Sequence, residues 1–144
     1  MRERIPSVDG VDYPVWAWHT YNGKHSKPDL RHSGFGNRGD KMVCLEIEIP
    51  DDAVVLSEFD DWHYVLNKVY LSMSKSSEEW EAADAYFDAL PPDERDRVLV
   101  ESWDNIFDLT PFENDWVARG KYIQATFWEL RKENIVRMQK FSCR

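Results

Sequence analysis

The spacing of apolar residues changes twice along this chain of 144 residues, and the resulting order of elements constrains the fold strongly. Near both ends, apolar and polar residues alternate, as they do in half-buried strands. Between about residues 57 and 110, apolar residues recur every three or four positions, as on one face of a helix. Strands that are segregated from helices along a chain favour an α+β fold with mainly antiparallel pairing.

Five segments have strand composition or alternation: 13–20, 41–50, 53–56, 122–130 and 135–141. The last two are separated by a short turn at 131–134, so the sequence predicts a C-terminal β-hairpin. Three central helices are expected between the early and late strands. Their predicted starts are Ser57 or Asp60 with an apolar stripe over 62–73, Ser76 with Glu79 as a capping box, and Pro92 after Pro91.

The length suits one domain, which we expect to consist of a polar N-terminal arm (1–12) and a single globular domain (13–144). A net charge of −9 repels nucleic acid and anionic lipid, so neither non-specific nucleic acid nor a membrane is an expected partner. Cys44 and Cys143 form no CxxC pair, and neither a signal peptide nor a long apolar run is present. These features predict a cytoplasmic protein, with Cys143 in an exposed tail.

The segment 22–40 predicts a long loop with the opposite charge to the rest of the chain. From residue 22 to 41 there are five Lys or Arg residues against two Asp residues. Glycines allow backbone N–H groups to approach an anion, and arginine can bind a phosphate through two hydrogen bonds. Arg31 and Lys27 are therefore candidate contacts for a nucleotide or another phosphate-bearing small molecule. The alternative is a solvated loop that neighbours acidic helices.

Polar residues interrupt the strand-like run YIQATFWEL (122–130). Alternation places Gln124 and Thr126 on one face, whereas Glu129 falls on the other. This face predicts either a hydrogen-bonding platform for a ligand or the solvent side of a half-buried sheet. His19, near the end of the first strand, could act as a base or simply bond to the backbone.

A metal site is not expected, because the four histidines and two cysteines lack the close spacing of zinc ligands. A metal-dependent hydrolase using Glu46, Glu48 and His63 is the least favoured hypothesis. The two glutamates on one strand face more simply indicate a solvated surface.

Five motifs together resemble an uncharacterised, mostly bacterial family that is known as a domain of unknown function. They are PVWAW (14–18), KPDLR (27–31), LEIEIPDD (45–52), WHYVLN (62–67) and QATFWEL (124–130). The resemblance covers most of the chain and implies no settled activity.

A second resemblance is to the ADP-ribosyltransferase superfamily, which places a His or Arg on an early strand and a Glu in a QAEF-like late run. His19 and Thr20 match the early position, and QATF (124–127) resembles the late run with Thr126 in place of Glu. The resemblance implies a domain that binds NAD or another nucleotide and that could be a transferase. The residues assigned on this basis are His19 and Glu129 for catalysis, and Trp16, Trp18, Lys27, Arg31, Gln124 and Thr126 for ligand binding.

The main alternative is a non-catalytic, acidic protein-binding module of bacterial or phage origin. Its acidic helices would engage a basic protein, since opposite charges speed encounters between partners. The sequence leaves open whether the chain is an enzyme.

Overall fold

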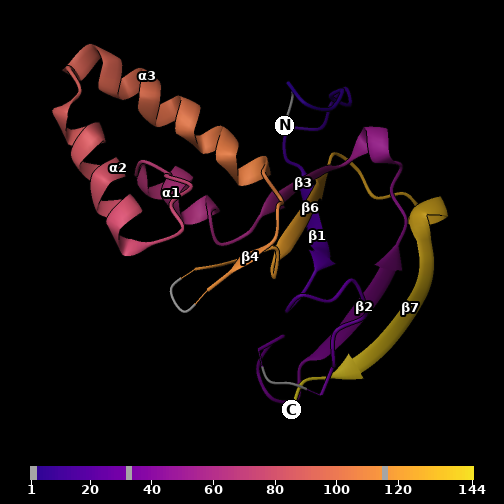
Figure 1. Ribbon diagram of the computed structural model, residues 1–144. Helices are drawn as coiled ribbons and strands as arrows, with labels where there is room; N and C mark the ends of the chain where they lie inside the picture. The colour runs from indigo at the N-terminus through magenta and orange to yellow at the C-terminus, as the bar shows by residue number, and fades with distance from the viewer. Residues whose placement is uncertain (1–2, 32–33, 115–116) are drawn as a thin grey trace. The chain divides into compact units, whose positions relative to one another are not determined.

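Figure 1 shows the computed structural model, which describes residues 3–31, 34–114 and 117–144. The described residues form seven strands, three α-helices and three short 3-10 helices, which confirms the α+β fold class. The strands are β1 (Val15–Thr20), β2 (Lys41–Ile47), β3 (Val55–Glu58), β4 (Phe112–Glu113), β5 (Ala118–Arg119), β6 (Ile123–Phe127) and β7 (Ile135–Ser142). The helices are α1 (Trp62–Asn67), α2 (Ser77–Ala89), α3 (Pro92–Ser102), η1 (Asp51–Ala53), η2 (Trp103–Phe107) and η3 (Lys132–Asn134).

The strands form one three-stranded sheet in the order β1-β6-β3 and two antiparallel pairs, β2-β7 and β4-β5. The chain thus ends in an antiparallel strand pair, but the partner of β7 is β2 and not the preceding strand β6. A hairpin needs a turn of about two to five residues. Residues 128–134, which include η3, connect β6 to β7, and β2 offers β7 a partner along its whole length. Strands β4 and β5, which are two residues long, are not predicted from the sequence.

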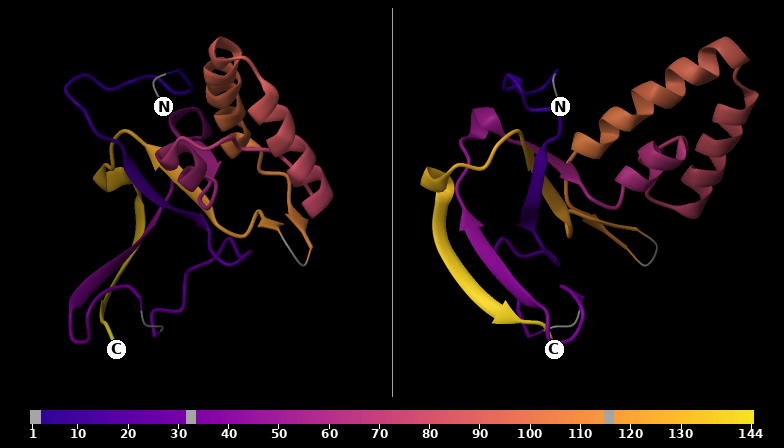
Figure 2. Two further views of the ribbon diagram at one scale, coloured as in Figure 1. Left: turned by 90° about the vertical axis from the view of Figure 1, so that its left-hand side faces the viewer. Right: turned by 180° about the vertical axis from the view of Figure 1, so that it is seen from behind.

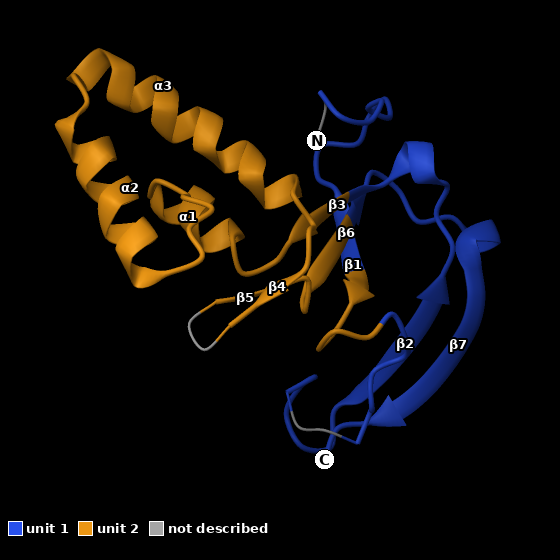
Figure 3. Ribbon diagram, in the orientation of Figure 1, with its two compact units in different colours: residues 1–17, 25–55, 126–144 blue, residues 18–24, 56–125 orange. Residues whose placement is uncertain are grey.

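The chain divides into two compact units (Figure 3). Unit 1 comprises residues 1–17, 25–55 and 126–144, and unit 2 comprises residues 18–24 and 56–125. The expectation of an N-terminal arm followed by a single globular domain stays a prediction.

Unit 1 contains the β2-β7 ribbon, whose strands run side by side in every view (Figure 2). The register runs from Lys41 opposite Ser142 to Ile47 opposite Ile135, with a β-bulge after Glu46. The Phe35 ring packs edge-on against Phe141, at 5.8 Å between ring centroids. This contact attaches part of the segment 22–40 to the β2-β7 ribbon.

Cys143 is buried, so the prediction of an exposed tail is wrong. Its N–H donates to the carbonyl of Asp40 and its carbonyl accepts from Gly39, both at 2.9 Å. A Cβ on Gly36 would lie 3.2 Å from the Cys143 sulfur, so a glycine suits this close approach. Backbone hydrogen bonds thus continue beyond the end of β7 and hold Cys143 beside Gly39 and Asp40.

In unit 2, α1 ends at Asn67, although the apolar stripe predicted helical spacing as far as Met73. Lys68 adopts a left-handed conformation, with φ of 54°, and this ends the helix. The residues after Lys68 do not continue the helix, because side chains of η2 bind the carbonyls of residues 69 and 71. Trp103 Nε1 donates to the Val69 carbonyl at 2.9 Å, and Asn105 donates to that of Leu71 at 3.1 Å.

The next two helices begin where the sequence predicts. The Ser76 hydroxyl accepts a hydrogen bond from Glu79 N–H at 3.2 Å, which caps the first turn of α2. Pro92 occupies the first turn of α3, where its missing N–H costs no helical hydrogen bond. No described residue of α2 is fully buried; Ala83 and Phe87 are half-buried, and the Phe87 ring stacks on Tyr70 at 4.6 Å between centroids.

Candidate functional site

Four aromatic side chains of unit 2 pack edge-on against one another, and we call them the aromatic cluster: Trp18, Tyr21, Phe59 and Tyr122. The Trp18 ring lies 4.8 Å from Phe59, 5.3 Å from Tyr21 and 6.2 Å from Tyr122, between centroids. Tyr21 and Tyr122 are 5.4 Å apart. A hydrogen bond of 2.8 Å from Phe59 N–H to the Tyr122 carbonyl fixes two of the contributing backbone segments. The cluster is therefore held by backbone as well as by ring contacts.

The aromatic cluster is accessible to a ligand through Tyr21, which is 40% exposed. Trp18, Phe59 and Tyr122 are half-buried. Gln124 on β6 is also half-buried, and it follows Tyr122, which lies just before the strand, by two residues. Aromatic rings beside an amide can stack a planar ligand ring and hydrogen-bond its edge.

His19 and Thr126 belong to neighbouring strands, since β1 is hydrogen-bonded to β6. His19 is half-buried, and its Nδ1 lies 3.0 Å from the buried hydroxyl of Thr20. Alternation along β1 directs His19 to the opposite side from Trp18. Thr126 is buried. The platform role predicted for Thr126 and the catalytic role predicted for His19 stay predictions.

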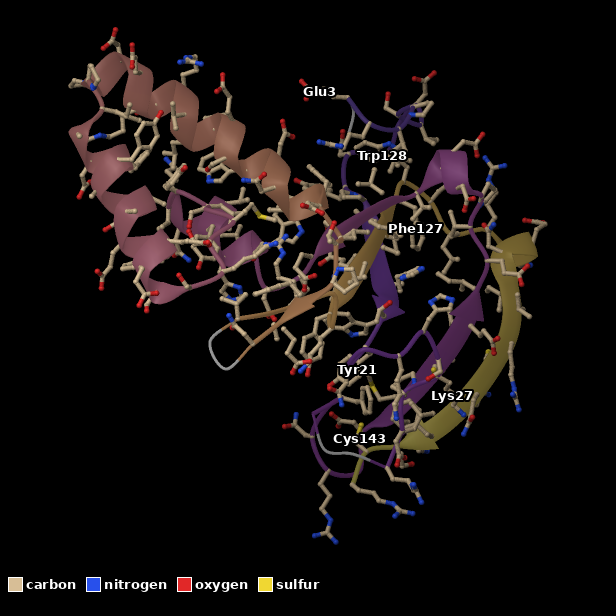
Figure 4. The ribbon with its side chains drawn as sticks, viewed as in Figure 1. Glu3, Tyr21, Lys27, Phe127, Trp128 and Cys143 are labelled. Atoms are coloured by element: carbon tan, nitrogen blue, oxygen red, sulfur yellow. The ribbon has the colours of Figure 1, made fainter. Side chains whose placement is uncertain are left out.

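The remaining predicted site residues belong to unit 1, and each has an interaction partner. Arg31 forms a bidentate ion pair with Asp29, in which the shorter contact is 2.6 Å. Lys27 donates to the Gln139 side chain on the ribbon (Figure 4). Trp16 is exposed, and Glu129 forms an ion pair with Arg131. Their predicted roles stay predictions.

Unit 2 also contains a buried charge cluster that sequence analysis missed: Glu58, Asp61 and Arg119. Arg119 Nη1 lies 2.5 Å from Asp61 Oδ2. Arg119 Nη2 donates to the carbonyls of Asn105 at 3.1 Å and Asp108 at 2.9 Å. Glu58 is only 1% exposed, and its Oε2 accepts from Gly120 N–H at 2.8 Å. The cluster thus joins β3, the start of α1, the end of η2 and β5.

Burial changes the proton affinity of both carboxyl groups. The pKa of Glu58 is raised by burial, an effect that the Gly120 N–H partly opposes. The pKa of Asp61 is also raised by burial, against the opposing charge and hydrogen bond of Arg119. Both buried carboxyls therefore retain protons to a higher pH than exposed carboxyls do.

The raised pKa of Glu58 predicts a specific pH dependence of stability. Between the ordinary carboxyl pKa and the raised value, the folded protein binds more protons than the unfolded chain, so the free energy of unfolding falls as the pH rises. The variant Glu58→Gln lacks this group. The free energy of unfolding of Glu58→Gln, relative to that of wild type, should therefore increase as the pH rises above the ordinary carboxyl pKa. Urea unfolding at several pH values measures this difference. The exposed variant Glu113→Gln is the control, and parallel curves for Glu58→Gln and wild type would contradict the prediction.

Unit 2 also has a shallow, open hollow, which is lined by His63, Tyr64, Asn67 and Val69. The His63 ring lies edge-on to Phe59 of the aromatic cluster, at 6.4 Å between centroids. Among the described residues, no three His, Cys, Asp or Glu side chains gather closely enough to hold a metal ion.

The fold and these clusters define an α+β protein with an aromatic-lined surface and an acidic, helix-rich unit. The chain belongs to the family described as a domain of unknown function (DUF3841), which matches residues 1–136. Searches of curated proteins and of solved structures gave no match. In the part of the chain that the structure describes, no helix combines the length and apolarity that crossing a membrane requires.

Proposed function

We propose that unit 2 binds the planar ring of a nucleotide, NAD or a related molecule, at the aromatic cluster. The observation that carries the proposal is the accessible Tyr21 ring beside Trp18 and Tyr122, with Gln124 two residues after Tyr122 in the chain. Base-aromatic stacking contributes about 1–3 kcal/mol for each base. The amide of Gln124 carries both donors and an acceptor for the polar edge of such a ring.

The sequence also assigns phosphate contacts to Lys27 and Arg31 and ribose contacts to Thr126 and Glu129. These residues belong to unit 1, so their roles are separate predictions and no part of the ring-binding site proposed in unit 2. Transfer of an ADP-ribose group is the activity to assay once binding is shown. A cytoplasmic location accords with this proposal, because NAD and other nucleotides are abundant there.

The first test compares two tyrosines of unit 2. The variant Tyr21→Ala removes the accessible ring of the aromatic cluster, so it should weaken nucleotide binding by about 5- to 150-fold, from the stacking energy above. Tyr86→Ala, which removes an exposed tyrosine of α2, should leave binding unchanged. Isothermal titration calorimetry with NAD, ADP-ribose and ATP measures both. No binding of any of the three to wild type would refute the proposal.

A second candidate function is an acidic protein-binding module of bacterial or phage origin. Unit 2 has 16 acidic residues and 7 Lys or Arg residues, whereas unit 1 has 11 of each, so the whole net charge of −9 belongs to unit 2. Helix α2 carries several of these acids. A unit with this charge would attract a basic protein over distances up to about 10 Å at ordinary ionic strength.

Charge reversal tests this second candidate. The double variant Glu81→Lys/Asp84→Lys changes two exposed acids of α2, and Asp51→Lys/Asp52→Lys makes the same change in unit 1. If α2 is the docking surface, capture of a basic protein from bacterial lysate should weaken at least several-fold for the first variant only. Equal capture by both variants would remove α2 from the interaction.

A further inference from the structure

The buried charge cluster contains polar atoms that the protein itself leaves unsatisfied. Among the described residues, Glu58 Oε1 and Arg119 Nε are buried and have no hydrogen-bond partner. Asp61 Oδ2 is also buried, and its contact is the ion pair with Arg119 Nη1 at 2.5 Å, which leaves a second lone pair of this oxygen for another donor. The side chains of Asp61 and Arg119 are 11% and 10% exposed, and Glu58 is almost wholly enclosed.

The three atoms belong to one compact group. Arg119 Nε and Nη1 are part of the same rigid guanidinium, and Nη1 lies 2.5 Å from Asp61 Oδ2. Glu58 is bonded through Oε2 to Gly120, the residue that follows Arg119. Both Asp61 and Arg119 influence Glu58 electrostatically, so all three side chains are close together. One small group between these side chains would be the simplest partner for all three atoms.

The chemistry of the atoms identifies that group. Arg119 Nε is a donor, whereas Glu58 Oε1 and Asp61 Oδ2 are acceptors when ionised. One water molecule can accept a hydrogen bond from the first and donate to the other two. Buried waters typically make about three hydrogen bonds to polar groups that the protein leaves unsatisfied. A metal cation would satisfy the two oxygens but would face the N–H of Arg119, which can only donate.

We propose that unit 2 holds one internal water molecule that bridges Arg119 Nε to Glu58 Oε1 and Asp61 Oδ2. The water completes the link between β3, the start of α1 and β5, and so stabilises the backbone from which Phe59 and Tyr122 enter the aromatic cluster. Where one carboxyl is protonated, the water accepts from that O–H and still donates to the other carboxylate. The site is independent of nucleotide binding, since it requires only the folded protein.

The primary test is a high-resolution crystal structure of the full chain. We expect an isolated electron-density peak about 2.7–3.2 Å from both Arg119 Nε and Glu58 Oε1, with the occupancy and contacts of a water oxygen. A direct hydrogen bond between these two atoms, a coordinated cation in their place, or an empty site between them would overturn the proposal.

NMR spectroscopy tests the bridge in solution. The Arg119 Nε–H proton should show cross-relaxation with a long-lived water molecule. The variant Glu58→Met removes one acceptor, so the signal should disappear. The control Glu113→Met changes an exposed glutamate and should retain it. Absence of the signal in wild type, or its persistence in Glu58→Met, would overturn the bridge. If Glu58→Met does not fold, the wild-type crystal structure and the wild-type signal still decide.

Discussion

Replacing Arg119 by methionine is expected to destabilise unit 2 by about 3–5 kcal/mol, because removing one partner of a buried ion pair leaves an uncompensated charge. The variant would leave Asp61 buried without its cation. It would also leave the carbonyls of Asn105 and Asp108 without the guanidinium donor. Methionine keeps much of the volume of the side chain, so the loss would reflect charge and hydrogen bonding more than a cavity.

The helical circular-dichroism signal during urea unfolding is a suitable measurement, since α1, α2 and α3 all belong to unit 2. The control is Arg97→Met, which breaks an exposed ion pair with Glu101 and should cost at most about 1 kcal/mol. Equal losses in the two variants would show that the buried charge cluster does not stabilise the unit.

Replacing Phe127 by alanine should have an effect of similar size, about 3–5 kcal/mol, because it combines a lost transfer energy with a cavity. Phe127 is 1% exposed and lies on β6, the central strand of the three-stranded sheet. A loss of packing there would weaken the contacts of β6 with both of its neighbours. Figure 4 marks Phe127 beside Trp128, another buried aromatic residue.

Urea unfolding followed by tryptophan fluorescence would measure this loss. Tyr13→Ala is a suitable aromatic control, because Tyr13 is 85% exposed and its removal should change stability by about 0.5 kcal/mol or less. A loss below about 1 kcal/mol for Phe127→Ala would mean that the strand repacks around the smaller side chain.

Local sequence signals predicted much of the secondary structure. Ser76 caps α2 and Pro92 opens α3 as predicted, because capping and proline geometry depend on a few neighbouring residues. The predicted extent of α1 was wrong, because the side chains of Trp103 and Asn105 bind the carbonyls of residues 69 and 71. Such hydrogen bonds join residues about thirty positions apart and leave no trace in local periodicity.

The candidate site could be predicted only in part. Trp18 and Gln124 attracted notice as an aromatic and an amide within strand-like runs, and both lie at or beside the aromatic cluster. Tyr21 and Phe59 were missed because their ring contacts join separate segments of the chain. Arg119 was missed because a lone arginine in a presumed loop carries no motif. A glutamate after an apolar run, as in VVLSEF (54–59), was the available signal for Glu58.

By itself, the sequence determined the fold class, the starts of α2 and α3 and the family, because capping, alternation and motif identity are local properties of a chain. Only the tertiary structure decided that β7 pairs with β2, that Cys143 and Glu58 are buried and that Asp61 pairs with Arg119. Strand pairing and buried charge depend on which distant segments meet. That choice rests on the sum of many packing and hydrogen-bond energies, which a local pattern does not encode.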